Sequence, residues 1–327
     1  MVTIVVHSTN DLAATLAKAL SSGGDSELLI GSKAEPDVSV IMRIYNSSEH
    51  VADALDSIAA QDYRGIIELV VVYSRATSDF SLKAMLPGIK KILTRGGTVR
   101  MLVREHNGTF RAYQEGLAAA KGRYVAVLDS DNFYYNAKLS RQIGFMEKRG
   151  ASFSFTAYQA VDAEGRQIRN VLPAVPRNYK DFSQLVSKYY VDLNTVVIDR
   201  RFRKMAMKAF GYIQGRAYDI CFEDYLIGMI ASLKDELEYV PEKLNAYRIW
   251  KGNFTMLKSH TAESKFDAVA KLAPYVQGTF AALLRINSEM HLTDRRILFN
   301  SWLELSGEPL SASFRRKGRL GRDSSGK

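Results

Sequence analysis

The sequence predicts an α/β fold with a mixed central sheet and helices on both faces. Two patterns carry this prediction. From Val38 onward short apolar runs alternate with amphipathic stretches, and four strand–helix steps of this kind follow one another along the chain. Consecutive steps of this type form parallel sheets, in which ligands bind outside the carboxyl ends of the strands. The 327 residues, 46% of them hydrophobic, suffice for a large core.

Residues 1–35 are expected to add one strand and one helix before the main domain. Leucines at four-residue spacing indicate the helix, and a link containing Gly, Ser and Pro follows it. The four main strands are then expected at "VSVIMRIY", "IIELVVVY", "TVRMLVR" and "RYVAVL". In the helix "RAYQEGLAAAKG", between the third and fourth of them, Gly122 is expected to be the C-cap.

After about residue 150 the pattern becomes mixed. The apolar runs "SFSFTAYQAV" and "LNTVVID" predict antiparallel strands added to the same sheet. Residues 256–312 have a helical period and predict a helical C-terminal appendage, whereas the basic residues 313–327 have too little apolar content to fold alone. We expect a flexible tail there.

Charge and cysteine content limit the partners and the compartment. The net charge of +10 favours anionic ligands, but no helix-turn-helix, zinc-finger or RNP-like segment is present, so nucleic acid is not an expected partner. The single cysteine, Cys221, is typical of a reducing compartment, and we expect a cytoplasmic protein. The basic tail has two readings: a solvated segment, or a peripheral contact with the inner face of the membrane.

Two pairs of acidic residues are the candidate chemical groups. Asp129 and Asp131 end the apolar run of "GRYVAVLDSDNFYY" and need a positive partner there, which could be a basic side chain, a helix N-terminus or a divalent cation. A purely structural alternative is that Asp131 or Asn132 caps the next helix. Glu223 and Asp224 begin the predicted helix in "CFEDYLIGMI", where favourable placement at a helix N-terminus is the structural alternative.

Several segments, taken in order, resemble the inverting nucleotide-sugar glycosyltransferases of family 2. They are "VSVIMRIYNSSEHVADALDSIAAQDY", "GLAAAKGRYVAVLDSDN", "AKLSRQIGFME", "FEDYLIGMIA" and "YVPEKLNAYRIWKGN". The resemblance implies a GT-A (nucleotide-diphospho-sugar transferase) domain at 36–255, between an N-terminal βα extension at 1–35 and the helical appendage.

The resemblance also implies roles for the acidic residues. Asp129 and Asp131 match the DXD motif, which implies that they serve a nucleotide-sugar diphosphate through Mg²⁺ or Mn²⁺. Asp131 is expected to bind the metal directly and Asp129 to orient the ribose or a metal-bound water. Asp224 matches the general base, supported by Glu223, of a single displacement with inversion.

The donor pocket is expected at the ends of the first two main strands. Tyr45 and Asn46 match the place where the nucleoside base lies in relatives. Ser74 and Arg75 stand where the family usually has paired aspartates, which weakens the expectation of a UDP-linked donor, and Asp79 is the candidate substitute.

Four further positions depart from the family. Arg43 stands where a proline is frequent, and Trp250 replaces a histidine found in many relatives. Tyr113 and Gln114 stand where Arg and Asn are frequent, and Arg111 is the candidate replacement cation. Arg43 and Arg111 are included among the expected donor-binding residues. The expected function is a hexosyltransferase-type glycosyltransferase of polysaccharide biosynthesis, with a nucleotide-sugar donor and a glycan or glycoconjugate acceptor. The alternative is a catalytically silent module that binds nucleotide or glycan, or scaffolds an assembly.

Overall fold

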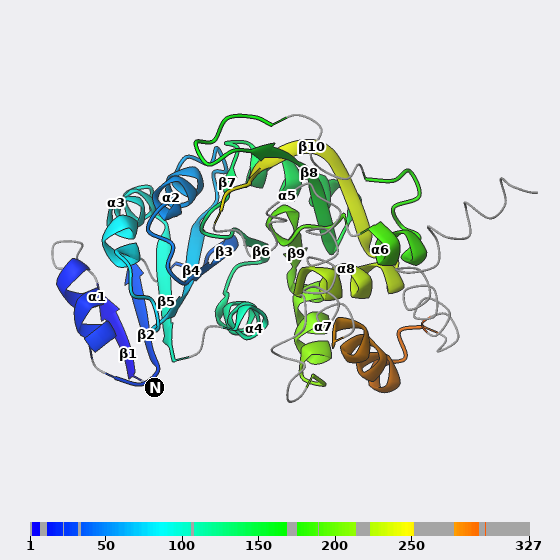
Figure 1. Cartoon of the computed structure of the whole chain (residues 1–327), viewed down its shortest axis with the longest axis horizontal. Helices are drawn as coiled ribbons and strands as arrows, with labels where there is room; N and C mark the ends of the chain where they lie inside the picture. The colour runs from blue at the N-terminus through cyan, green and yellow to red at the C-terminus, as the bar shows by residue number, and fades with distance from the viewer. Residues whose placement is uncertain are drawn as a thin grey trace, which may run out of the picture.

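The computed structural model describes residues 2–6, 12–21, 23–31, 34–105, 108–168, 175–188, 190–213, 223–251, 278–293 and 298. Its strands form one ten-stranded sheet in the order β1-β2-β5-β4-β3-β6-β9-β8-β10-β7, which curves through the molecule (Figure 1). The strands are β1 (Val2–Val6), β2 (Ser26–Gly31), β3 (Val38–Ile44), β4 (Ile67–Ser74), β5 (Thr98–Arg104), β6 (Tyr124–Val127), β7 (Phe133–Tyr134), β8 (Phe153–Val161), β9 (Val197–Asp199) and β10 (Leu237–Arg248).

Helices cover both faces of this sheet and enclose two apolar cores. The helices are α1 (Leu12–Ser21), α2 (Val51–Ala59), α3 (Ser81–Thr94), α4 (Thr109–Ala119), α5 (Lys138–Arg149), α6 (Phe182–Lys188), α7 (Arg200–Phe210) and α8 (Glu223–Leu233), with a 3-10 turn, η1, at Leu193–Thr195. Core residues of α1, α2, α3 and α5 form one cluster, and those of α4, α6, α7 and α8 form the other. Side chains of β3 alternate between the two, as expected for a buried strand.

The four main strands are confirmed and are parallel to one another. β3 pairs with β4 on one side and β6 on the other, and β4 pairs with β5. The predicted antiparallel additions are confirmed in part, since β9 runs antiparallel to both β6 and β8. β8, however, runs in the same direction as the four main strands, because it is antiparallel to β9, and β10 is parallel to β8. The carboxyl ends of β3, β4 and β6 therefore meet at one edge, where the candidate residues lie.

Two local predictions are wrong. The link after the first helix contains a strand, β2, which pairs with β1 and, antiparallel, with β5. Gly122 does not cap α4, because the C-cap is Ala120. Glycine is required at 122 for a different reason: a Cβ there would lie 2.5 Å from the backbone nitrogen of Ser39 on β3, so only glycine allows this close approach.

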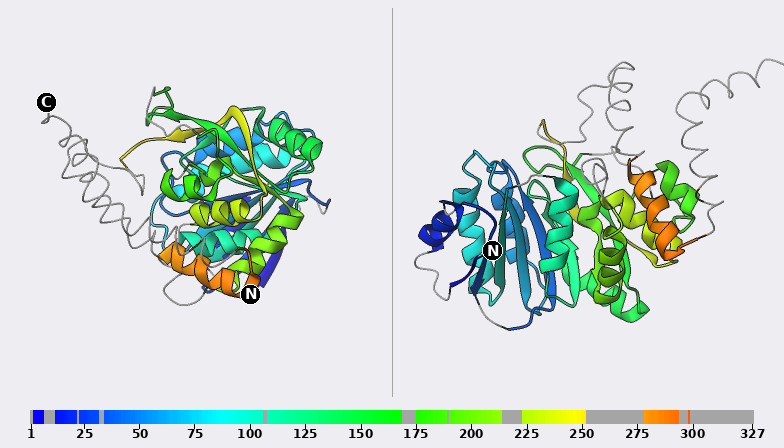
Figure 2. Two further views of the ribbon diagram at one scale, coloured as in Figure 1. Left: turned by 90° about the vertical axis from the view of Figure 1, so that its right-hand side faces the viewer. Right: turned by 90° about the horizontal axis from the view of Figure 1, so that it is seen from below.

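Part of the predicted appendage is described. Residues 278–290 are helical, and Phe280, Leu283 and Ile286 are buried in the cluster that also contains side chains of α7 and α8. Both views of Figure 2 show this helix in orange near those elements. The rest of 256–312, apart from residues 291–293 and 298, and the whole of 313–327 lie outside the described residues. Within the described parts no helix has both the length and the apolar character needed to cross a bilayer.

Candidate active site

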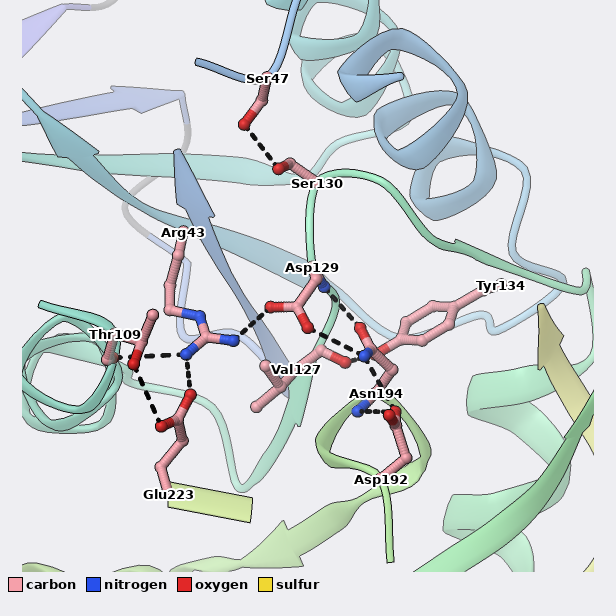
Figure 3. A network of polar contacts seen from close by, with 10 residues as sticks. All are labelled: Arg43, Ser47, Thr109, Val127, Asp129, Ser130, Tyr134, Asp192, Asn194 and Glu223. Atoms are coloured by element: carbon pink, nitrogen blue, oxygen red, sulfur yellow. Dashed lines mark hydrogen bonds and ion pairs between the residues drawn. The ribbon is translucent and has the colours of Figure 1, made fainter. Parts of the chain in front are cut away.

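Arg43 lies at the centre of the candidate site and joins the two acidic pairs. It is the penultimate residue of β3, and its guanidinium forms ion pairs with Asp129, which follows β6, and with Glu223, the first residue of α8 (Figure 3). The same group also donates to the carbonyl oxygen of Thr109 at 3.3 Å. An arginine is therefore the positive partner of Asp129 in this structure.

Electrostatics favour the charged form of Arg43. Burial by itself would lower the pKa of the guanidinium, but the charges of Asp129 and Glu223 outweigh that effect and raise the pKa above its usual value. The side chain is 16% exposed, and that of Glu223 is 8% exposed. In such a site an unpaired carboxylate would be costly, so the cation is what allows the two acidic pairs to lie close together.

Asn194 holds Asp129 from the other side. Its amide nitrogen donates to Asp129 Oδ2 at 3.0 Å, and its side-chain oxygen accepts from the backbone N–H of Asp129 at 2.6 Å. Asn194 lies in η1, where Asp192 accepts from its backbone and side-chain nitrogens, each at 2.9 Å. Burial raises the pKa of Asp192 to about 6, although the hydrogen bonds from Asn194 oppose the rise. Each oxygen of Asp129 thus has a protein donor.

Asp131 lies against the end of β10. Trp250 Nε1 donates to Asp131 Oδ2 at 3.0 Å, and Arg248 Nε donates to the Asp131 carbonyl oxygen at 2.8 Å. Burial, followed by the charge of Asp129, raises the pKa of Asp131. The capping alternative is wrong for the next helix, because the N-cap of α5 is Ala137 and not Asp131 or Asn132.

Asp224 has the pKa of a neutral-pH base. Burial raises the pKa of this carboxyl to about 7, against the lowering effects of a hydrogen bond from Tyr225 and the charge of Arg43. The Tyr225 N–H donates to Asp224 Oδ1 at 2.8 Å. The neighbouring Glu223 also accepts from the Thr109 hydroxyl at 3.4 Å. Its side chain therefore contacts the start of α4, in addition to lying at the N-terminus of α8.

The expected nucleoside site consists of two loops that are hydrogen-bonded to each other. Tyr45 is 51% exposed just after β3, which leaves its ring available for stacking. Asn46 has a φ of 49°, and its side-chain oxygen accepts from the Ser78 N–H at 2.9 Å. Asp79 accepts from the backbone nitrogens of Ser48 and Ser81 at 2.8 and 2.9 Å. Hydrogen bonds lower the pKa of Asp79 although burial opposes them, so this carboxylate holds the loops in place.

Ser74, the last residue of β4, and Arg75, which follows it, contact other parts of the protein. Arg75 Nε donates to the carbonyl oxygen of Gly24 at 2.9 Å and pairs with Glu105 at 3.1 Å, so the side chain is directed toward the N-terminal extension. Ser74 is buried, and its hydroxyl oxygen accepts from the Ala76 N–H at 3.3 Å. Arg111 is exposed in the first turn of α4. The donor-binding roles of these three residues stay predictions.

The sequence reasoning missed Asn194, Asp192 and Thr109. The segment "YVDLNTVV" reads as a strand start, although an Asp-x-Asn sequence is a signal for a capped turn. Its position against Asp129 follows only from the pairing of β9 with β6.

The residues fit a divalent cation through Asp131. Within the described ranges no three His, Cys, Asp or Glu side chains gather so as to hold a metal ion by themselves. Mg²⁺ commonly takes one or two carboxylates and completes its shell with phosphate oxygens and water, so a single carboxylate is a sufficient protein donor. Asp131 matches this requirement, because burial beside Asp129 makes its negative charge costly until a cation is near.

Comparisons with known proteins agree with these observations. The profile "Glycosyl transferase family 2" matches residues 39–209. An uncharacterized glycosyltransferase of Rickettsia felis is 30% identical over 161 residues, which cover 49% of this chain and 24% of that protein. The putative teichuronic acid biosynthesis glycosyltransferase TuaG of Bacillus subtilis is 31% identical over 51% of this chain and 63% of its own length. The chain therefore spans about a quarter of the first relative and less than two thirds of the second.

Solved structures show the same fold. S. aureus TarS 1-349, crystallised in complex with UDP-GlcNAc, has a TM-score of 0.51 at 18% sequence identity, covering 77% of this chain and 73% of that one. The GT-A fold predicted from the sequence is confirmed by this likeness.

Proposed function

The chain belongs to glycosyl transferase family 2, and from that membership we propose that it transfers a sugar from a nucleotide-sugar donor to a hydroxyl of a glycan or glycoconjugate acceptor. One observation above all supports this. The two acidic pairs, which come from distant parts of the sequence, converge on Arg43 at the carboxyl edge of the parallel strands. That edge is where ligands bind in sheets of this type.

Asp224 is the proposed general base. With a pKa of about 7 its carboxylate is substantially ionised at neutral pH, and it is basic enough to accept a proton. The acceptor oxygen attacks the anomeric carbon, its proton goes to Asp224, and the bond from that carbon to the diphosphate breaks. One such displacement inverts the anomeric configuration.

Asp131 is the proposed holder of Mg²⁺ or Mn²⁺, and the ion would supply a Lewis acid for the departing diphosphate. Asp129 contributes by holding Arg43 and Asn194, and Tyr45 by stacking on the base. The family and the relative TuaG support a role in polysaccharide assembly. We propose a hexosyl group as the transferred sugar and a cytoplasmic site of action, with a peripheral membrane contact through the tail.

A silent nucleotide- or glycan-binding module is the second candidate. It is favoured by one observation: Ser74 is buried and Arg75 is directed to the N-terminal extension, so neither residue supplies an acceptor for a base at the end of β4.

Titration calorimetry with UDP, GDP, CDP, ADP and TDP, each with and without Mn²⁺, separates these functions. We expect one nucleotide to bind in a metal-dependent way and Asp131→Ala to abolish the metal dependence. Asp62→Ala is the matched control, since Asp62 is exposed after α2. Turnover of the sugar-linked form of that nucleotide, with the product anomer read by NMR, completes the test. Binding without turnover over a broad acceptor panel would favour the silent module.

A further inference from the structure

The backbone does not fix the distance across the candidate site. The ladder between β3 and β6 ends at the pair Ile41–Val127, and the last hydrogen bond between them runs from the Leu128 N–H to the Ile41 carbonyl. Arg43 and Asp129 lie beyond that point. Glu223 begins a helix, which is outside the sheet. Side chains must therefore set the spacing between the DXD-type segment and the start of α8.

The guanidinium of Arg43 has the contacts needed to set this spacing. One terminal nitrogen of its guanidinium contacts Asp129 and the other contacts Glu223, so a single planar group spans both carboxylates (Figure 3). The nitrogen that contacts Glu223 also donates to the Thr109 carbonyl, which ties the bridge to the first turn of α4. A guanidinium presents its donors in a fixed fork and stays charged at any physiological pH, whereas an ammonium has no such fixed geometry.

We propose that Arg43 is a positioning residue that joins the donor half of the site to the acceptor half. It holds Asp129 directly and, through Glu223, holds the first turn of α8, from which Asp224 projects. The bridge joins both halves through contacts within the protein. This proposal rests on the proposed function for its catalytic meaning, but the geometry it describes can be measured without turnover.

The test compares Arg43→Gln and Arg43→Lys with Arg100→Gln. Arg100 on β5 is the matched control, because it likewise bridges two carboxylates, Glu27 and Glu68, far from the acidic pairs. Hydrogen exchange of peptides covering 127–131 and 223–228 reports the positions of the two halves. Donor KM and kcat are measured in parallel, and melting curves show which variants remain folded.

Arg43→Gln is expected to speed exchange in both peptides and to lower kcat on the order of 100-fold, the cost of a small misplacement of reacting groups. Donor KM should change less than kcat, because the interaction lost is one of alignment. Arg43→Lys should restore part of both readouts. Arg100→Gln should leave kcat unchanged and should not speed exchange in these two peptides more than in the rest of the protein. Adding Glu223→Gln to Arg43→Gln should cost little more, since both act through one contact.

Three results would overturn the proposal. One is unchanged exchange at 223–228 in Arg43→Gln, even with reduced kcat, which would mean that Arg43 acts on the substrate. Another is that EDTA alone loosens 223–228 in the wild-type protein as much as Arg43→Gln does. The third is that Arg100→Gln loosens the same peptides equally. If no donor is turned over by the wild-type protein, the proposed function fails, and the exchange data still decide this inference.

Discussion

Two arginines of this molecule each form ion pairs with two carboxylates, but in different surroundings. Arg100 contacts Glu27 and Glu68 with a side chain that is 12% exposed, and Arg43, at 16% exposure, contacts its own pair of carboxylates at the active-site edge. In both places one guanidinium pairs with two acids, and in both its charged form is favoured, because the carboxylates outweigh the effect of burial on its pKa.

The difference lies in what else holds the carboxylates. Arg100 is paired across the sheet with Leu29 on β2 and Val70 on β4, so the strands that carry its partners are already aligned by backbone hydrogen bonds. The partners of Arg43, in contrast, lie outside the strand pairs: Asp129 follows the last paired residues of β6, and Glu223 begins a helix. The ion pairs of Arg100 are therefore expected to contribute stability, whereas those of Arg43 are expected to align the candidate active site. The function of an ion pair thus depends on what the backbone already fixes.

The largest expected effect is on the group that the Arg43 bridge positions. Asp224→Asn removes the proposed base at nearly constant shape and should lower kcat by about 10²- to 10⁴-fold. Nucleotide affinity by calorimetry should persist, because the carboxylate acts on the acceptor. In the wild-type protein kcat/KM should rise as pH increases through about 7, where this carboxyl loses its proton. Retained turnover in Asp224→Asn would show that Asp224 is not the general base, and Arg43 would then differ from Arg100 in position only.

The same variant should gain stability at alkaline pH. The folded-state pKa of Asp224, about 7, lies above its ordinary value of 3.8, so the folded protein keeps a proton that the unfolded chain releases in this window. Folding therefore loses stability as pH rises from about 4 to about 7. Melting curves of Asp224→Asn and wild type should differ at about pH 8 and coincide at about pH 4; equal differences at both values would contradict the assignment.

Arg100→Gln should have the next largest effect, and on stability only. Glu68 is 2% exposed, and leaving a buried carboxylate without its partner costs about 3–5 kcal/mol. Denaturant titration measures the loss, and kcat at a temperature where the variant is folded should equal that of wild type. A parallel fall in kcat would show that the ion pairs of Arg100 also affect the active site.

Asn194→Ala should give an intermediate result at the donor end of the bridge. It removes the second partner of Asp129 and leaves the Asp129 N–H unpaired, at a cost of about 1–3 kcal/mol. Turnover should fall by about tenfold if roughly 1.4 kcal/mol of that cost appears in the transition state. Asn194→Asp, which keeps the acceptor but adds a charge beside Asp129, should be worse than alanine.

Tyr45→Ala should have the smallest effect. Stacking on a nucleoside base contributes about 1–3 kcal/mol, so nucleotide affinity should fall about fivefold at the lower end of that range. Tyr45→Phe keeps the ring and is the control. Because the side chain is half-exposed, the melting temperature should not change in either variant. Equal loss in both variants would point to the hydroxyl and away from stacking.

The sequence predicted the regular part of the fold well because apolar periodicity records burial directly. Val51, Ala54, Leu55 and Ile58 are the buried face of α2, as their spacing indicates. β2 was missed because its six residues lie among Gly and Ser and alternate between buried and partly exposed positions, which weakens the apolar signal. Its place between β1 and β5 depends on pairing, which no local pattern contains.

The candidate site also has a part that the sequence could predict and a part that it could not. Both acidic pairs could be located, because charge at the end of an apolar run is visible in the sequence. The orientation of Arg75 toward Gly24, and the approach of Asn194 to Asp129, depend on contacts between segments 51 and 65 residues apart. Such contacts are set by the closing of the sheet, and residue type alone cannot specify them.

The separation of the two bridge partners along the chain has a consequence for biosynthesis. Asp129 lies 86 residues after Arg43, and Glu223 lies 180 residues after it. Because a nascent chain folds from its N-terminus as it emerges, β3, β4, β5 and β6 can pair while α8 is still untranslated. Arg43 then pairs with Asp129 alone, and the guanidinium nitrogen that contacts Glu223 in the folded protein still lacks that carboxylate. Chains that terminate before residue 223 should therefore fold in part without acquiring an aligned site.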